Sequence, residues 1–95
     1  MISQGYNYVN IFVLVWVQEM NEFVEKRVGK NIRSFREKAG ITQDALAAKL
    51  QVLGCDITRS AVAKIEVGQR HLYPDELILI REILGVPYDA LLDLS

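Results

Sequence analysis

Three side chains that can donate hydrogen bonds to another molecule recur at helical spacing between residues 58 and 67. Arg59, Ser60 and Lys64 would lie on one side of a helix, and the apolar Val62 and Ile65 on the other. Guanidinium, hydroxyl and ammonium groups suit phosphate oxygens and the acceptor atoms of bases. The pattern predicts a short helix that is held by its apolar side and presents its polar side to a partner. An ordinary solvated helix has the same pattern, so other features must decide.

Charge is distributed unevenly along the 95 residues. The formal net charge is −1, but residues 1–25 carry three acids and no base, for a net charge of −3. Residues 26–70 carry ten bases and four acids, which gives +6, and residues 71–95 carry one base and five acids, which gives −4. A basic central segment is what binding to phosphates requires, although chance clustering on a solvated surface is the alternative. The distribution favours a nucleic-acid partner in spite of the overall charge.

Composition excludes several classes of protein. An apolar content of 51% in 95 residues is typical of one packed domain and argues against disorder. The single Cys55 cannot form a disulfide within the chain, so we expect a reducing, cytoplasmic location. There is no cluster of metal ligands, and we expect no metal and no other cofactor. Cys55 and His71 offer a thiol and a base, but nothing supplies an orienting acid or oxyanion donors, so we do not expect an enzyme.

The segment after residue 20 has a helical pattern. Asn21 can cap a first helix and Gly40 can end it. Its apolar positions recur at intervals of three and four: Val24, Val28, Ile32, Phe35 and Ala39. Its opposite face is basic, with Lys26, Lys30, Arg33 and Arg36 or their neighbours. The pattern predicts a first helix that buries one side.

Capping residues predict four further helices. Thr42 opens a second helix with Leu46, Ala47, Leu50 and Leu53 on its core side, and Thr58 opens a third that ends near Gly68. Pro74 opens a fourth helix that ends at Gly85. Pro87 opens a short fifth helix, whose expected anchors are Leu91, Leu92 and Leu94. The expected fold class is therefore all-α with five helices.

Residues 9–17 are rich in β-branched and aromatic side chains, which favours a strand over a helix. The run is too short to cross a membrane, and the segment lacks the basic start and cleavage site of a signal peptide. Three interpretations remain: a strand that pairs with a second copy, an arm on the domain's own apolar surface, or an extension ahead of a start at Met20. We divide the chain into an apolar N-terminal arm or extension, residues 1–20, and a helical domain, residues 21–95.

The order of several motifs resembles the lambda-repressor-like helix-turn-helix family, the type found in phage Cro and repressor proteins and in xenobiotic-response-element regulators. The resemblance covers roughly residues 28–94. It rests on Gly29-x-x-Ile32-Arg33-x-x-Arg36, on Gly-Ile-Thr-Gln at 40–43, on Leu-Ala-x-x-Leu at 46–50, on Thr-Arg-Ser-x-Val-x-Lys-Ile-Glu-x-Gly at 58–68 and on Leu-Gly-Val-Pro at 84–87. Residues 51–56 depart from it, because they contain an insertion of some five residues. We expect a longer second helix there and a looser, extended turn.

The resemblance implies roles for individual residues. The third helix, residues 58–67, would be the recognition helix in the major groove of double-stranded DNA. The residues implied to contact bases are Arg59, Ser60, Ala61 and Lys64. The residues implied to contact phosphates are Thr42, Gln43, Lys49 and Arg70. Arg36 and Glu66 would form a structural ion pair that joins the first helix to the third.

The favoured function is sequence-specific DNA binding by a small, repressor-like transcriptional regulator. We expect a homodimer, because one helix of this size contacts only a few base pairs. No membrane association is expected. The alternative is a protein-interaction module, either antitoxin-like or a subunit of a complex, whose partner binds the apolar residues 9–17.

Overall fold

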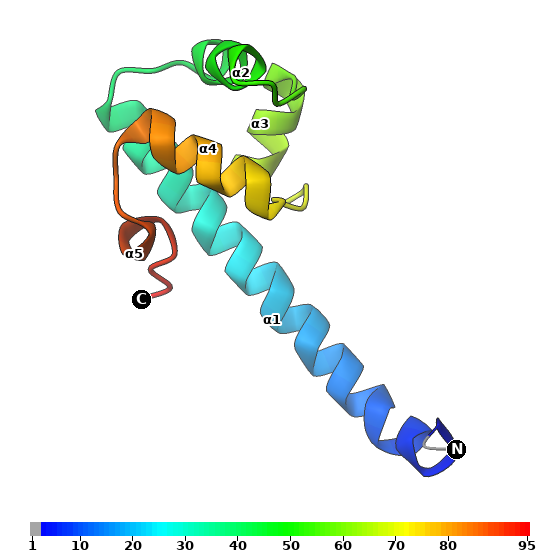
Figure 1. Cartoon of the computed structure of the whole chain (residues 1–95). Coiled ribbons are helices and arrows are strands. Elements are labelled where there is room, and N and C mark those ends of the chain that lie inside the picture. Colours follow the sequence, from blue (N-terminus) through cyan, green and yellow to red (C-terminus); the bar gives the residue numbers. More distant parts are fainter. Residues whose placement is uncertain (1–2) are drawn as a thin grey trace.

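The longest element of the fold is α1 (Ser3–Lys38), a single helix of 36 residues. The computed structural model describes the backbone of residues 3–95 and the side chains from residue 11 onward. Four shorter helices follow, namely α2 (Gln43–Val52), α3 (Arg59–Glu66), α4 (Pro74–Leu84) and α5 (Tyr88–Leu91). They gather around the C-terminal half of α1, whereas its N-terminal half extends away from them (Figure 1). Residues 3–95 contain no strand, so the predicted all-α fold with five helices is confirmed.

The structure corrects the prediction for the N-terminal segment. Residues 9–17 lie in α1, so the predicted strand is wrong, and Asn21 lies inside this helix instead of capping it. The segment is not an arm on the domain's own surface either, since every described side chain from residue 11 to residue 17 is exposed. Two effects explain the helix. No proline interrupts residues 3–38, and a helix satisfies its own backbone groups, which a lone strand cannot do.

The core lies where α1, α2, α3 and α4 meet. Its side chains come from all five helices and from the turn before α3, and the fully buried ones are Ile32, Leu46, Leu50, Ile57, Val62, Ile80 and Leu91. Leu91 is the buried residue of α5. Leu92 and Leu94, which follow this helix, are 44% and 41% exposed. The predicted anchoring by these two leucines is therefore wrong. The buried Leu91 and the side chain of Asn31, which donates to the carbonyls of Leu91 and Asp93 at 2.9 and 2.8 Å, hold the C-terminal end of the chain on α1.

Gly29 is the point of closest approach between α1 and α3. A Cβ atom at this position would lie 2.2 Å from the carbonyl oxygen of Ile65 and 2.9 Å from that of Glu66. Both are backbone atoms, so neither can rotate away. Glycine inside a helix costs about 1 kcal/mol relative to alanine. The close contact with α3 explains why residue 29 is nevertheless a glycine. Gly29 thereby lets α3 lie directly against α1.

The predicted caps set the ends of the helices. The Oγ1 atoms of Thr42 and Thr58 each accept a hydrogen bond of 3.1 Å, from the backbone N–H groups of Ala45 and Ala61. Pro74 occupies the first turn of α4, and this helix ends at Gly85 in a left-handed conformation. These caps fix where α2 and α3 begin and therefore how the two helices are oriented at their N-termini.

The inserted segment between α2 and α3 forms an extended, irregular turn over residues 53–58, and hydrogen bonds hold it in place. The amide nitrogen of Cys55 donates to the carbonyl of Leu50 at 2.9 Å. The side-chain nitrogen of Gln51 donates to the carbonyl of Ile57 at 2.7 Å, and the Ile57 side chain is buried. Leu53 caps the end of α2 and is 49% exposed, so it is not the core residue predicted. The extended turn holds α2 and α3 in a fixed arrangement.

The part of the chain that the structure describes has no helix that combines the length and the apolar character needed to cross a lipid bilayer.

Candidate nucleic-acid interface

The third helix is anchored on one side and polar on the other. Its buried side chains are Val62, Ile65 and Glu66. Arg59, Ser60 and Lys64 are exposed, and Ala61 is half-buried at the edge of the same surface. The structure therefore brings the four residues implied to contact bases onto one helix, and all except Ala61 are fully open to solvent. This polar side of α3 is the candidate interface.

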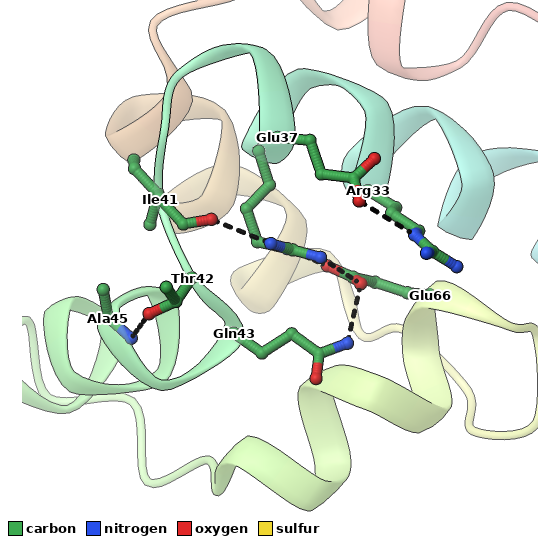
Figure 2. Close-up of polar contacts among 8 residues, drawn as sticks. Arg33, Glu37, Ile41, Thr42, Gln43, Ala45 and Glu66 are labelled. Carbon is green, nitrogen blue, oxygen red and sulfur yellow. Dashed lines mark hydrogen bonds and ion pairs between the residues drawn. The ribbon is translucent and has the colours of Figure 1, made fainter.

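A buried ion pair fixes the C-terminal end of α3. The Nε and Nη2 atoms of Arg36 donate to the two carboxylate oxygens of Glu66, at 2.6 and 2.9 Å (Figure 2). The side chains are 9% and 1% exposed, so water does not screen the pair. The Arg36 guanidinium also donates to the carbonyl of Ile41 at 2.8 Å. This one side chain joins the end of α1, the turn before α2 and the end of α3.

The hydrogen bonds to Glu66 raise the pKa of Arg36, and they outweigh the burial that would lower it. Arg36 therefore stays charged at neutral pH. The sequence implied this ion pair, and the bidentate geometry explains why arginine is needed. A lysine at residue 36 could not hold both oxygens of the carboxylate and the carbonyl together.

Gln43 is a third member of this network, which the sequence did not reveal. Its Nε2 atom donates to Oε1 of Glu66 at 3.0 Å, and Figure 2 shows the side chain directed at the carboxylate. The amide nitrogen is thus engaged inside the protein, and the hydroxyl of Thr42 is engaged with Ala45. An anion could instead bind to the backbone N–H groups of the first turn of α2, because these groups have no partners within the helix.

A long ion pair links α3 to α2. The Nε atom of Arg59 lies 3.8 Å from Oδ1 of Asp44, and both side chains are mostly exposed, at 65% and 78%. Exposed pairs of this kind contribute at most about 1 kcal/mol. Asp44 therefore does not hold Arg59 firmly, and the guanidinium can leave it for a better acceptor. Nothing in the sequence pattern predicted this contact, because the two residues lie on different helices.

Arg70 lies in the connection between α3 and α4. Its terminal nitrogens donate to the carboxylate of Glu76 at 2.8 and 3.0 Å, and Oε1 of Glu76 also accepts from the amide of Tyr73 at 3.0 Å. Burial would raise the pKa of Glu76, but these hydrogen bonds and the charge of Arg70 hold it below its ordinary value. The guanidinium implied to contact phosphate already has a partner that caps α4.

The Arg70–Glu76 pair makes a prediction about acid stability. Because the pKa of Glu76 is lower in the folded state than its ordinary value of 4.5, the pair stabilises the fold fully above that pH. The stabilisation is lost as the pH falls below 4.5 through the folded-state pKa. Urea unfolding at a series of pH values should show this loss in the natural chain and a smaller loss in Glu76→Gln. Glu82→Gln, which removes an exposed carboxylate of α4, should keep the natural pH dependence.

The remaining candidate, Lys49, is exposed in the last turn of α2. It lies six residues beyond Gln43, about 9 Å along the helix axis. The structure does not place it beside the first turn of α2. Lys26 and Lys30 of α1 are exposed and have no ion-pair partner among the described residues.

Cys55 is half-buried in the extended turn. Burial, together with the nearby acids Glu76 and Asp75, raises the pKa of its thiol. A thiol with a raised pKa is protonated at neutral pH and is a poor nucleophile. The described residues also contain no group of three His, Cys, Asp or Glu side chains that could hold a metal ion.

Comparison with known proteins gives the family. The model of the helix-turn-helix family matches residues 32–91, which is more than half of the chain and includes the ion pair, the extended turn and α3. The chain belongs to the helix-turn-helix family. Within it, the match is to the lambda-repressor-like type, as the motifs predicted. No curated protein and no solved structure shows significant similarity to the chain.

Membership explains the geometry of this helix-turn-helix domain. In the family, α2 and α3 form the motif, and the second of these helices is the one that meets DNA. Members typically bind DNA and are not enzymes. The matched segment begins at residue 32, so the N-terminal part of α1 lies outside the family pattern.

Proposed function

We propose that this chain is a transcriptional regulator that binds double-stranded DNA at specific sequences. The observation that carries the proposal is the polar side of α3, with Arg59, Ser60 and Lys64 exposed together on a helix whose other side is locked into the core. A helix fixed in this way loses little conformational entropy when it binds. A flexible helix with the same residues would lose much of its affinity to ordering.

Each residue has a role in the proposed complex. α3 would lie in the major groove, where Arg59 and Lys64 donate to guanine acceptors. The hydroxyl of Ser60 can donate or accept and so could contact either a base acceptor or a base donor. Ala61, which is small and half-buried, would allow close approach to the base edges. The first turn of α2, at Thr42 and Gln43, would hold a phosphate through backbone N–H groups. Lys49 and Arg70 would add phosphate contacts, and Arg70 would first have to exchange its bond to Glu76.

The proposed regulator acts as a homodimer. A single helix of eight residues contacts only a few base pairs, which is too little to select a site in a genome. Two copies on half-sites about one helical turn apart restore the needed discrimination. The preferred DNA sequence should therefore be an inverted repeat.

A second candidate function is binding to a different protein, as in an antitoxin or a subunit of a complex. It is favoured by the exposed apolar side chains of residues 11–17 and by the acidic charge of residues 1–25. Neither feature contributes to DNA binding. The two candidates differ in how affinity for duplex DNA should depend on salt.

Salt dependence of duplex binding tests the proposal. Each phosphate that a cation neutralises releases counterions, so affinity should fall steeply between about 50 and 200 mM salt. Arg59→Ala should lower the affinity for the preferred sequence by about tenfold to hundredfold and leave binding to other sequences nearly unchanged. Arg81→Gln removes a positive charge from α4 and is the control, with affinity close to that of the natural chain. Duplex binding that is undetectable, or insensitive to salt, in a folded sample would favour the second candidate.

A further inference from the structure

The N-terminal half of α1 carries an apolar stripe that no other described part of the chain covers. We define the stripe by six residues that share one broad side of the helix: Phe12, Val13, Trp16, Val17, Met20 and Phe23. The aromatic members Phe12, Trp16 and Phe23 are 80%, 59% and 56% exposed. Figure 1 shows this part of α1 projecting from the domain with no helix beside it. Exposed apolar surface of this extent marks an interaction site.

The area of the stripe is a large part of one half of a stable protein interface. A fully covered aromatic side chain buries roughly 150–250 Å², and the three in the stripe are 56–80% exposed, so together they can still bury about 300–500 Å². The two valines and the methionine add to this area, against roughly 800 Å² per partner in a standard interface. The stripe follows a single helix for more than three turns, so its partner must be an element that runs along it, such as another helix.

The charges around the stripe exclude two classes of partner. Glu22 and Glu25 lie on the opposite side of the helix, and Glu19 lies at the edge of the stripe. Residues 11–25 contain no base. An acidic helix repels DNA phosphates. It is also unlike the helices that lie on membranes, whose polar faces are rich in lysine and arginine. A protein surface is the occupant that these charges allow.

We propose that the stripe binds the same stripe of a second copy of this chain, in an antiparallel pair of α1 helices. A two-fold axis near residues 18 and 19 would align the two stripes along their whole length. The inference goes beyond DNA binding, since the dimer forms without DNA. The stripe of a second copy has the required length, apolar area and charge. It is also present at the same concentration as the chain itself.

A groove at the base of the stripe gives the reason for the antiparallel direction. It has a volume of about 310 Å³ and lies between α1, the connection before α4, and the C-terminal end of the chain. Its apolar lining comes from Val24, Val28, Leu72, Leu77 and Leu92. The antiparallel alignment places Phe12 beside the partner's Val24, at the mouth of this groove. Residues 11–15 are apolar on every side of the helix, and the partner's domain can cover more of that surface than a single helix could.

The mass of the full chain in solution tests the pairing. Sedimentation equilibrium at micromolar concentration without DNA should give a dimer. Trp16→Glu should give a monomer, because a carboxylate would be buried in the interface. Gln18→Glu adds the same group on the polar side of α1 and should remain a dimer. Trp16 and Gln18 are exposed in the single chain. Neither substitution should therefore lower the unfolding temperature of the monomeric domain.

Disulfide formation tests the direction, in chains that carry Cys55→Ser. Val13→Cys alone should not cross-link, because its two copies are about 16 Å apart along an antiparallel pair. A mixture of Val13→Cys and Val24→Cys chains should form a disulfide between unlike chains. Cross-linking of Val13→Cys to itself would overturn the antiparallel arrangement. A monomeric natural chain, or a dimer that Trp16→Glu does not weaken, would overturn the proposal as a whole.

Discussion

Replacing Arg36 with alanine is expected to lower the free energy of unfolding by about 3–5 kcal/mol, as breaking a buried ion pair does. The loss comes mainly from Glu66, whose side chain is 1% exposed and would keep a charge without its main partner. Gln43 would still donate to one carboxylate oxygen, but a neutral amide cannot replace the guanidinium. A domain of this size has a total stability of about 5–15 kcal/mol, so a substantial part of it depends on this pair.

Urea unfolding of three variants separates the pair from other effects of arginine. Arg33→Ala is the control, since Arg33 lies on the same helix and pairs with Glu37 at 3.4 Å with both side chains more than half exposed. It should cost no more than about 0.5 kcal/mol. The double variant Arg36→Met, Glu66→Leu should recover most of the loss, because apolar residues can replace a buried pair. A small loss in Arg36→Ala itself would show that the pair is not the lock between α1 and α3.

Replacing Gly29 with alanine is expected to destabilise the fold by about 3 kcal/mol, the upper end of the cost of overpacking. Helix propensity alone predicts the opposite, a gain of about 1 kcal/mol. The steric contact should decide the sign, since the new Cβ would lie 2.2 Å from the backbone oxygen of Ile65. α1 and α3 would have to separate, and the Arg36–Glu66 pair, about two turns further along α1, would lengthen.

Thermal unfolding monitored by circular dichroism can check this sign. Lys30→Ala introduces the same residue at the next position of α1, where the side chain is exposed. It should change stability by less than about 0.5 kcal/mol. If Gly29→Ala raised the midpoint, α1 and α3 would not be in contact at residue 29, and the position of the recognition helix would need revision.

The sequence predicted the domain well where local signals were strong. Thr42, Thr58 and Pro74 mark helix starts because each solves a local problem of the first turn, and no distant residue is needed. The periodicity of apolar residues, which is also a local signal, placed Leu46, Leu50 and Val62 in the core. The Arg36–Glu66 pair spans 30 residues, and it was found only through the resemblance to a family.

Contacts between elements were beyond local signals. Gln43 with Glu66, Arg59 with Asp44 and Arg70 with Glu76 each depend on how the elements they join meet in space, which no spacing rule encodes. The β-branched side chains of residues 9–17 favour a strand over a helix, yet the segment is helical. The strand propensity of these residues matters less than their position directly before a helix that is already formed. Once α1 has formed in the core, each further residue adds one hydrogen bond at little cost, and nothing in the segment stops it.

Selection of preferred sequences from a pool of random duplexes tests the central claim most directly, that α3 distinguishes DNA sequences through its polar side. The natural chain should enrich an inverted repeat with half-sites about one helical turn apart. Lys64→Ala, which leaves the buried side of α3 intact, should enrich the same repeat with the preference relaxed at one base pair in each half-site. No enrichment by the natural chain, or an identical preference in Lys64→Ala and Arg59→Ala, would contradict the account.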